Sequence, residues 1–287
     1  MKIKNRPNKW LVIDGHNLAW RSFHAIKSQP MMSLDNIRTE VVYIFLSSMI
    51  HLQRIHNTKR IVFCFDRKPT KRLKIYPDYK SNRRKRKRER SEKEKEQEKH
   101  FRDQLRILRT SILPSIGYKN IFAFKGYEAD DIIAKIVKDS IGPKDEAVII
   151  SSDHDLFQLL NTQVWVWNPI TREAMTSKHF RKSYGIKPKQ WAEMKAIAGC
   201  SSDFVKGVVG VGDLTALRYL RKELMEHSKA YIDIQNSTEV IARNRELVTL
   251  PIAGLPEIKL LPDTLNRENW GKITDKLSIY SLEDALY

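Results

Sequence analysis

Three short apolar segments, each followed by aspartate, constrain the fold of this chain more than any other feature of its sequence. The segments and the acids after them are Trp10–Ile13 with Asp14, Ile61–Phe65 with Asp66, and Ala147–Ile150 with Asp153 and Asp155. Each segment is rich in β-branched or aromatic residues and is continuous rather than alternating, which is typical of strands covered on both faces of a sheet. A fourth segment of this kind, Val164–Trp167, ends before an Asn-Pro turn.

Helix-length stretches lie between these segments, at residues 39–54, 98–116 and 128–137. Strands that alternate with helices predict an α/β fold whose central sheet is mostly parallel and flanked by helices. Beyond residue 180 the pattern changes to helices alone, predicted at residues 188–198, 213–225 and 238–250. We therefore expect an α/β core over residues 1–180 and a helical subdomain over residues 181–287.

Basic residues are distributed unevenly along the chain. The formal net charge is +18, and residues 67–90 alone hold 13 Lys and Arg against two acids. A local surplus of this size indicates a polyanionic partner, most simply nucleic acid. Within residues 83–99 the basic run gives way to alternating Glu and Lys with almost no apolar face. We expect this segment to be helical, to project from the core and to be mobile without ligand.

The two cysteines and the short apolar runs indicate in which cellular compartment the protein is found. Cys64 and Cys200 lie far apart in the chain, which favours a reducing compartment over a disulfide scaffold. No apolar run approaches the length of a membrane span. We expect a soluble, cytoplasmic protein with no membrane partner.

Carboxylates gather where ligands bind open α/β sheets, beyond the carboxyl ends of the strands. The four strand-end acids would meet there, and Glu128, Asp130 and Asp131 add three more at the start of a helix. Any one of these acids has an ordinary explanation as a helix-capping or turn-forming residue. Together they would repel one another unless cations bind. All-oxygen ligands suit Mg²⁺ or Mn²⁺ better than zinc, although the adjacent His16 and His154 leave a softer metal open.

An acidic metal site inside a strongly basic protein fits a phosphodiester substrate. Basic residues would bind the backbone of the nucleic acid, and metal ions would supply the hydrolytic chemistry. The sequence therefore favours metal-assisted hydrolysis of phosphodiesters.

Six fragments of the chain resemble the 5′-nuclease family, which includes phage 5′→3′ exonucleases, flap endonucleases and the 5′-nuclease domain of bacterial DNA polymerase I. The fragments are VIDGHNLAWRSFH (12–24), FCFDRK (63–68), YPDYKSNR (76–83), GYEADDIIA (126–134), SSDHDLFQLL (151–160) and the glycine-rich stretch 207–212. They occur in family order across nearly the whole chain. The resemblance implies a PIN-like nuclease core, a basic helical arch at about residues 72–100 and a C-terminal helix-three-turn-helix element. A phage origin would place the protein in the host cytoplasm.

The resemblance also implies roles for individual residues. The metal ligands, for two or more Mg²⁺ or Mn²⁺ ions, would be Asp14, Asp66, Glu128, Asp130, Asp131, Asp153, Asp155 and Asp203. Lys80 and Arg83 would be catalytic, at the base of the arch beside the scissile phosphate, although both also fit an ordinary solvated basic run. The expected DNA contacts are Arg72, Tyr79, Lys80, Arg83, Lys195, Lys206, Gly207, Gly210 and Gly212. A K⁺ ion in the 207–212 hairpin is a further expectation of the resemblance.

One position departs from the family pattern. The family has Gly-Asp-x-x-Asp before the hairpin, whereas this chain has Gly199-Cys200-Ser201-Ser202-Asp203. A thiol is a poor Mg²⁺ ligand, so Cys200 would weaken one metal position or shift its preference toward Mn²⁺.

These features predict a divalent-metal-dependent, structure-specific 5′-nuclease, both a 5′→3′ exonuclease and a flap endonuclease, active in replication. Its expected partners are DNA with a 5′ flap or 5′ end, an RNA–DNA hybrid and replication proteins, and we expect a monomer. The alternative is a catalytically weakened, structure-specific DNA-binding protein, for which Cys200 would be the sign. A PIN-like ribonuclease is a second alternative, but it would not need the region 188–228 or the basic arch.

Overall fold

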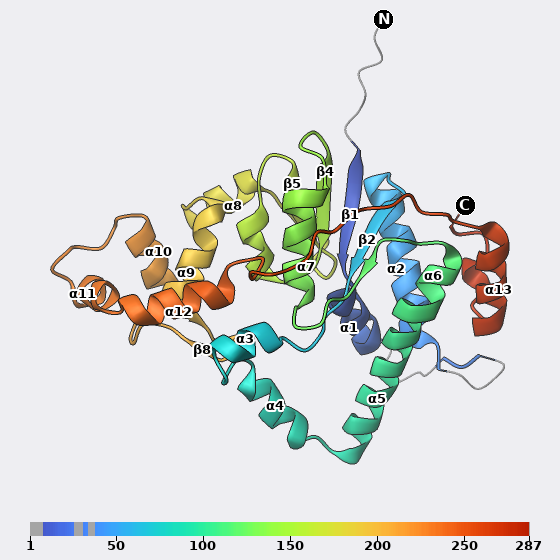
Figure 1. Cartoon of the computed structure of the whole chain (residues 1–287), viewed down its shortest axis with the longest axis horizontal. Coiled ribbons are helices and arrows are strands. Elements are labelled where there is room, and N and C mark those ends of the chain that lie inside the picture. Colours follow the sequence, from blue (N-terminus) through green and yellow to red (C-terminus); the bar gives the residue numbers. More distant parts are fainter. Residues whose placement is uncertain (1–7, 26–30, 34–37, 287) are drawn as a thin grey trace, which may run out of the picture.

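The central sheet has the strand order β3-β2-β1-β4-β5-β6 (Figure 1). The structure is a computed structural model that describes residues 8–25, 31–33 and 38–286. The strands are β1 (Lys9–Asp14), β2 (Arg60–Cys64), β3 (Ile121–Phe122), β4 (Glu146–Ile150), β5 (Val164–Asn168) and β6 (Glu173–Met175). The first five are parallel and β6 pairs antiparallel with β5, so the predicted mostly parallel sheet is confirmed.

Both faces of the sheet are buried, which explains why its strands are continuously apolar. Along β1, Leu11 and Ile13 point into one hydrophobic cluster and Val12 points into the other. Burial on both faces favours the β-branched residues that fill these strands.

The π-helical turn Leu108–Ile112 and five α-helices contribute to the cluster around Leu11 and Ile13. The α-helices are α1 (Gly15–Ala25), α2 (Glu40–His56), α5 (Glu92–Ile107), α6 (Leu113–Ile116) and α13 (Arg267–Leu277). Trp270 of α13 is fully buried there, and its indole nitrogen donates to the carbonyl of Leu282. The end of the described chain therefore packs on the same sheet face as α1 and α2.

The opposite cluster is formed with helices from the middle and later parts of the chain. They are α7 (Ala129–Lys135), α8 (Ser177–Tyr184), α9 (Trp191–Ala198), α10 (Asp213–Leu220), α11 (Lys229–Asn236) and α12 (Thr238–Val248). Helices on both sides of residue 180 share this cluster. The proposed boundary at residue 180 stays a prediction, and α13 lies apart from the other late helices (Figure 1).

A V-shaped pair of helices projects from the body of the molecule (Figure 1). The chain leaves the core through α3 (Thr70–Ile75), descends along α4 (Ser81–Arg88) and returns along α5. Glu98 of α5 holds the two arms together through ion pairs with Lys87, at 3.0 Å, and with Arg90. The predicted projecting helical segment is confirmed, and its mobility stays a prediction.

Several element boundaries differ from the predicted ones. The helix expected at residue 98 begins at Glu92 because Ser91 and Glu94 form a capping box. The helix expected to run to residue 225 ends at Leu220. Helix α1, which follows Asp14 directly, was not predicted. Among the described residues, no helix is both long and apolar enough to cross a membrane.

Candidate metal and nucleic-acid site

The strand-end aspartates meet at one edge of the sheet, as predicted. Strands β2, β1 and β4 are neighbours and parallel, so the residues after them emerge on the same side. Asp14 is the last residue of β1, Asp66 lies two residues beyond β2, and Asp153 lies three residues beyond β4. We call Asp14, Asp66 and Asp153 the rim group.

The rim group is held by neutral donors. Asp14 accepts from the amide of Asn17 at 3.0 Å and from the hydroxyl of Ser151 at 3.0 Å. Asp66 accepts from the amide of Ala129 at 2.7 Å, and Asp153 accepts from the amide of Asp155 at 2.8 Å. These bonds orient the carboxylates and leave their charge uncompensated.

Cationic partners are missing from the rim group. Among the side chains that the structure describes, no Lys or Arg pairs with Asp14, Asp66 or Asp153. His16 lies 3.5 Å from Asp66, but its Nδ1 accepts the Asp66 backbone amide at 2.9 Å. A nitrogen that accepts a hydrogen bond carries no proton, so His16 does not neutralise Asp66 through that atom.

Burial and mutual repulsion disturb the ionisation of this edge. Burial, with repulsion from Asp66 and Asp153, raises the pKa of Asp14 to about 7. Burial, with repulsion from Asp153, raises the pKa of Asp155 to about 6. Burial also raises the pKa of Asp130 well above its ordinary value. A bound cation would counteract these raised pKa values, because a nearby positive charge favours the charged form of a carboxylate.

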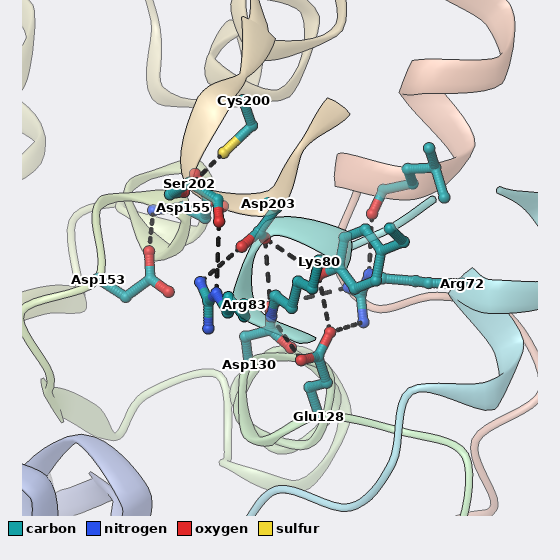
Figure 2. A network of polar contacts seen from close by, with 12 residues as sticks. Arg72, Lys80, Arg83, Glu128, Asp130, Asp153, Asp155, Cys200, Ser202 and Asp203 are labelled. Carbon is teal, nitrogen blue, oxygen red and sulfur yellow. Dashed lines mark hydrogen bonds and ion pairs between the residues drawn. The ribbon is translucent and has the colours of Figure 1, made fainter. Parts of the chain in front are cut away.

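A second set of acids is neutralised by cations from the base of the arch (Figure 2). We call Glu128, Asp131 and Asp203 the paired group. Lys80 Nζ lies 2.5 Å from Glu128 Oε1 and 3.6 Å from Asp203 Oδ2. The guanidinium of Arg83 donates to Asp203 Oδ1 at 2.6 Å. Attraction to Lys80 and Arg72 outweighs burial and lowers the pKa of Glu128.

Arg72 and Asp131 form a fully buried ion pair. The guanidinium donates to both oxygens of Asp131, at 2.5 and 2.9 Å, and its Nε donates to the carbonyl of Leu247 at 2.9 Å. Asp131 also accepts from the amides of Glu128 and Ile252. The pair therefore joins α3, α7 and the end of α12.

Three of the predicted site residues lie buried beneath the others in this arrangement. Arg72 and Tyr79 were expected to contact DNA, but they are 2% and 3% exposed, so neither reaches a ligand at the surface. The Tyr79 hydroxyl lies 2.8 Å from Glu128 and 3.1 Å from Asp203, inside the acidic set. Asp131 was expected to bind metal, but Arg72 and two amides occupy its oxygens. These three buried residues support the acids of the site through hydrogen bonds and ion pairs.

The remaining predicted contacts fall in two places. Lys195 lies 3.8 Å from Asp155, beside the acids, and Lys206 is exposed. A Cβ on Gly207 would lie 2.2 Å from the carbonyl carbon of Ala198, so this glycine allows the loop to pack on the end of α9. A Cβ on Gly210 or Gly212 would meet nothing within 4 Å. The hairpin backbone is therefore open around Gly210 and Gly212.

The position with the unexpected cysteine brings three candidate ligands together. The ligand atoms of Asp155, Cys200 and Asp203 lie within 4.8 Å of one another. Cys200 ends the two-residue strand β7 (Gly199–Cys200), which pairs with β8 (Val205–Lys206) and so turns Asp203 back toward Asp155. Oxygen-rich donors on the rim and a mixed set here are both chemically suited to divalent cations.

Sequence reasoning missed the residues that brace the rim. Asn17 donates through its side-chain amide to the Ser152 hydroxyl at 2.8 Å and accepts from the Ser152 amide at 3.1 Å. Together with the bond from Ser151 to Asp14, these contacts tie α1 to the loop after β4. The polar residues beside the acids in DGHN and SSDHD were the available signal.

Residues 9–185 match the family described as 5′-3′ exonuclease, N-terminal resolvase-like domain. Among curated proteins, the chain is 28% identical over 302 residues to DNA polymerase I of Mycobacterium tuberculosis (strain ATCC 25618 / H37Rv), with 96% of this chain and 31% of the relative covered. It is 30% identical over 213 residues to the thermostable DNA polymerase I of Thermus aquaticus, with 74% of this chain and 24% of the relative covered. The chain thus spans a third or less of the length of these relatives.

Solved structures share the fold. A T5 5′-exonuclease with bound divalent metal ions (zinc) has a TM-score of 0.72 at 24% identity, over 97% of this chain and 100% of that one. Human GEN1 in complex with Holliday junction DNA has a TM-score of 0.55 at 16% identity, over 95% of this chain and 68% of that one.

Proposed function

The chain belongs to the 5′-3′ exonuclease family, a family of nucleases, and from that premise we propose that it is a divalent-metal-dependent, structure-specific 5′-nuclease. Its substrates would be 5′ ends and 5′ flaps of DNA, and RNA primers in replication. The observation that carries the proposal is the rim group, three carboxylates gathered at one sheet edge without a cationic partner among the described side chains.

The acids that would hold the metal are the rim group together with Asp130, Asp155, Glu128 and Asp203. Mg²⁺ or Mn²⁺ suits the carboxylate oxygens of the rim. When bound, two such ions supply activation of water and stabilisation of the leaving oxygen in phosphodiester hydrolysis. Hydrolysis of this kind needs no covalent intermediate on the protein.

Lys80 is positioned to bind the phosphate that is cut. Its backbone amide donates to the carbonyl of Asp203 at 2.7 Å, and its left-handed conformation, with φ of 55°, turns the chain into α4. The ammonium group thereby lies between Glu128 and Asp203. A fixed positive charge at this point would stabilise negative charge that develops on the phosphoryl oxygens.

The surfaces around the acids would hold the rest of the substrate. The exposed cations of α4 line one arm of the arch, where they would bind a single strand through its phosphates. The open backbone at Gly210 and Gly212 would bind the duplex in the same sequence-independent way. We further propose that the protein acts as a monomer and that it binds DNA without recognising the bases.

A second function, structure-specific DNA binding with weakened catalysis, is favoured by one observation. Cys200 occupies the place of an acid in one candidate metal position, and burial raises the pKa of its thiol. A protonated thiol binds Mg²⁺ poorly. Under this alternative the rim acids would remain while turnover is slow.

Cleavage of an end-labelled 5′-flap duplex tests the two functions. We expect cleavage with Mg²⁺ or Mn²⁺ and none with a chelator, together with binding of the flap under both conditions. Binding without cleavage in either metal would support the weakened, DNA-binding function instead. Cleavage that persists in the chelator would contradict metal dependence.

A further inference from the structure

One candidate metal position contains a sulfur atom. Asp155, Cys200 and Asp203 present two carboxylates and one thiol within 4.8 Å of one another. The same three residues line a small cavity together with Asp130, and its other lining residues include Arg72, Tyr79 and Val205. The donors are thus assembled around a space rather than scattered over a surface.

The thiol of Cys200 is held in place by its backbone and by one side-chain contact. Cys200 is 8% exposed, and the β7–β8 pairing fixes its backbone. Its Sγ lies 3.0 Å from the Ser202 hydroxyl, as Figure 2 shows. Either atom can donate in this contact, which therefore holds the sulfur beside the two carboxylates in either protonation state.

Cations of the protein already gather around the same three residues. Lys195 Nζ lies 3.8 Å from Asp155, and Lys80 Nζ and the Arg83 guanidinium approach Asp203. Arg83 is 56% exposed, so it can leave Asp203 for solvent or for DNA phosphate. These side chains supply the positive charge beside Asp155 and Asp203 that a bound metal ion would otherwise supply.

The donor set decides which metal fits. Carboxylates alone suit Mg²⁺ and Mn²⁺, whereas thiolate ligands select zinc and other softer ions. We propose that Asp155, Cys200 and Asp203 form a thiolate-containing site that binds Zn²⁺ in preference to Mg²⁺, next to a rim group that keeps Mg²⁺ or Mn²⁺. This inference rests on the proposed function, because it assigns a metal to one position of that nuclease site.

The competing explanation is that Cys200 only packs. Its neighbours Tyr79, Val205 and Leu247 form a small hydrophobic cluster with it. A packing cysteine would leave the thiol unbound when metal is added. The second cysteine, Cys64, offers the matched control, because it is fully buried in the larger core cluster.

Cobalt absorption separates these explanations without any measurement of cleavage. Co²⁺ added to the full chain, stripped of metal, should produce the near-ultraviolet charge-transfer band of a cobalt–thiolate bond. Cys64→Ala should keep the band, and Cys200→Ser should lose it while the circular dichroism spectrum is retained. Zn²⁺ at equimolar concentration should abolish the band, and Mg²⁺ in large excess should not.

The opposite results overturn the inference. No band in the wild-type chain, a band that survives Cys200→Ser, or a band that Mg²⁺ abolishes would each do so. The affinity for Zn²⁺, measured by competition with a chromogenic chelator, should fall at least about 10-fold in both Cys200→Ser and Cys200→Asp, since loss of a residue that merely supports a ligand already costs that much. An unchanged affinity would contradict the thiolate site.

Flap cleavage in the same samples keeps this inference separate from the proposed function. A cobalt–thiolate band without cleavage in any metal would overturn the nuclease and leave the site standing. Cleavage without the band would overturn the site and leave the nuclease standing. If the thiol is what limits Mg²⁺ at this position, Cys200→Asp should raise Mg²⁺-supported cleavage.

Discussion

The rim group and the paired group contain the same functional group in one acidic region, but their surroundings are opposite. Within the described part of the chain, Asp14, Asp66 and Asp153 accept hydrogen bonds from backbone amides and a serine hydroxyl, all of them neutral donors. Glu128, Asp131 and Asp203 are neutralised by Arg72, Lys80 and Arg83, which come from α3 and the base of the arch. The uncompensated charge at the rim calls for a cation from outside, whereas the paired group already has cations of the protein beside it.

The paired group is itself graded. Asp131 and Arg72 are buried beneath the site and bind each other through two hydrogen bonds. Asp203 is instead held by Arg83, which reaches it from solvent. Asp131 is therefore a structural acid in a buried pair. Asp203 is in an exchangeable contact beside the metal-binding edge.

Removal of a rim carboxylate should have the largest effect. Asp153→Asn removes a charge that pairs with no Lys or Arg among the described side chains, so cleavage of a 5′ flap should fall at least about 1,000-fold. Binding of the flap should remain. The control is Asp139→Asn, an acid paired with Lys135 on the chain's own surface, which should cleave normally. Normal cleavage by Asp153→Asn would remove the rim group from the site.

The next largest effect should come from breaking the buried pair, and it should appear in stability. Arg72→Met leaves the charge of Asp131 buried without its partner, which should cost about 3 kcal/mol of unfolding free energy. Denaturant unfolding measures this change. Breaking the exposed Arg245–Glu193 pair with Arg245→Met should cost less than about 1 kcal/mol. Equal losses in the two variants would mean that the Arg72–Asp131 pair is not special.

Lys80 connects the two regions, and its loss should slow catalysis more than binding. Lys80→Ala removes the ammonium group beside Glu128 and Asp203, and single-turnover cleavage should slow about 100-fold. Lys85→Ala removes an exposed lysine of α4, the helix that begins directly after Lys80, and should change the rate far less. Similar losses in both variants would indicate that Lys80 acts only as one more cation of the arch.

The smallest of these effects should be a pH dependence of stability in the metal-free protein. The pKa of Asp14 is raised from 3.8 to about 7, so the folded state binds a proton that the unfolded state releases. Its contribution to the free energy of unfolding is full below pH 3.8 and is lost as pH rises to 7. Asp14→Asn should flatten the decline between pH 4 and 7, and Mn²⁺ should offset it in the wild-type chain. A decline that is identical in Asp14→Asn would assign it to other groups.

The sheet and its acidic edge were predictable because both follow from local patterns. Continuous apolar strands signal burial on both faces, and parallel strands place the residues after them on one side. The position of Asp14, Asp66 and Asp153 after strands was therefore enough to predict that they lie on the same side of the sheet. Their lack of cationic partners was not visible in the sequence.

The residues whose burial the sequence did not predict are those whose partners are remote in the chain. Arg72 lies in a run of basic residues, and nothing local distinguishes it from its exposed neighbours. Its burial depends on Asp131 and on the carbonyl of Leu247, which is 175 residues away. Tyr79 is likewise buried by contacts with Glu128 and Asp203. Long-range contacts of this kind decide the difference between a DNA contact and a structural support.

The most direct test of the account is to locate Mn²⁺ by anomalous diffraction in crystals of the wild-type chain. We expect an anomalous peak at bonding distance from carboxylate oxygens of Asp14, Asp66 or Asp153, with the Arg72–Asp131 ion pair unbroken. No peak at the rim, or a peak that displaces Arg72 from Asp131, would contradict the division between metal-binding and structural carboxylates.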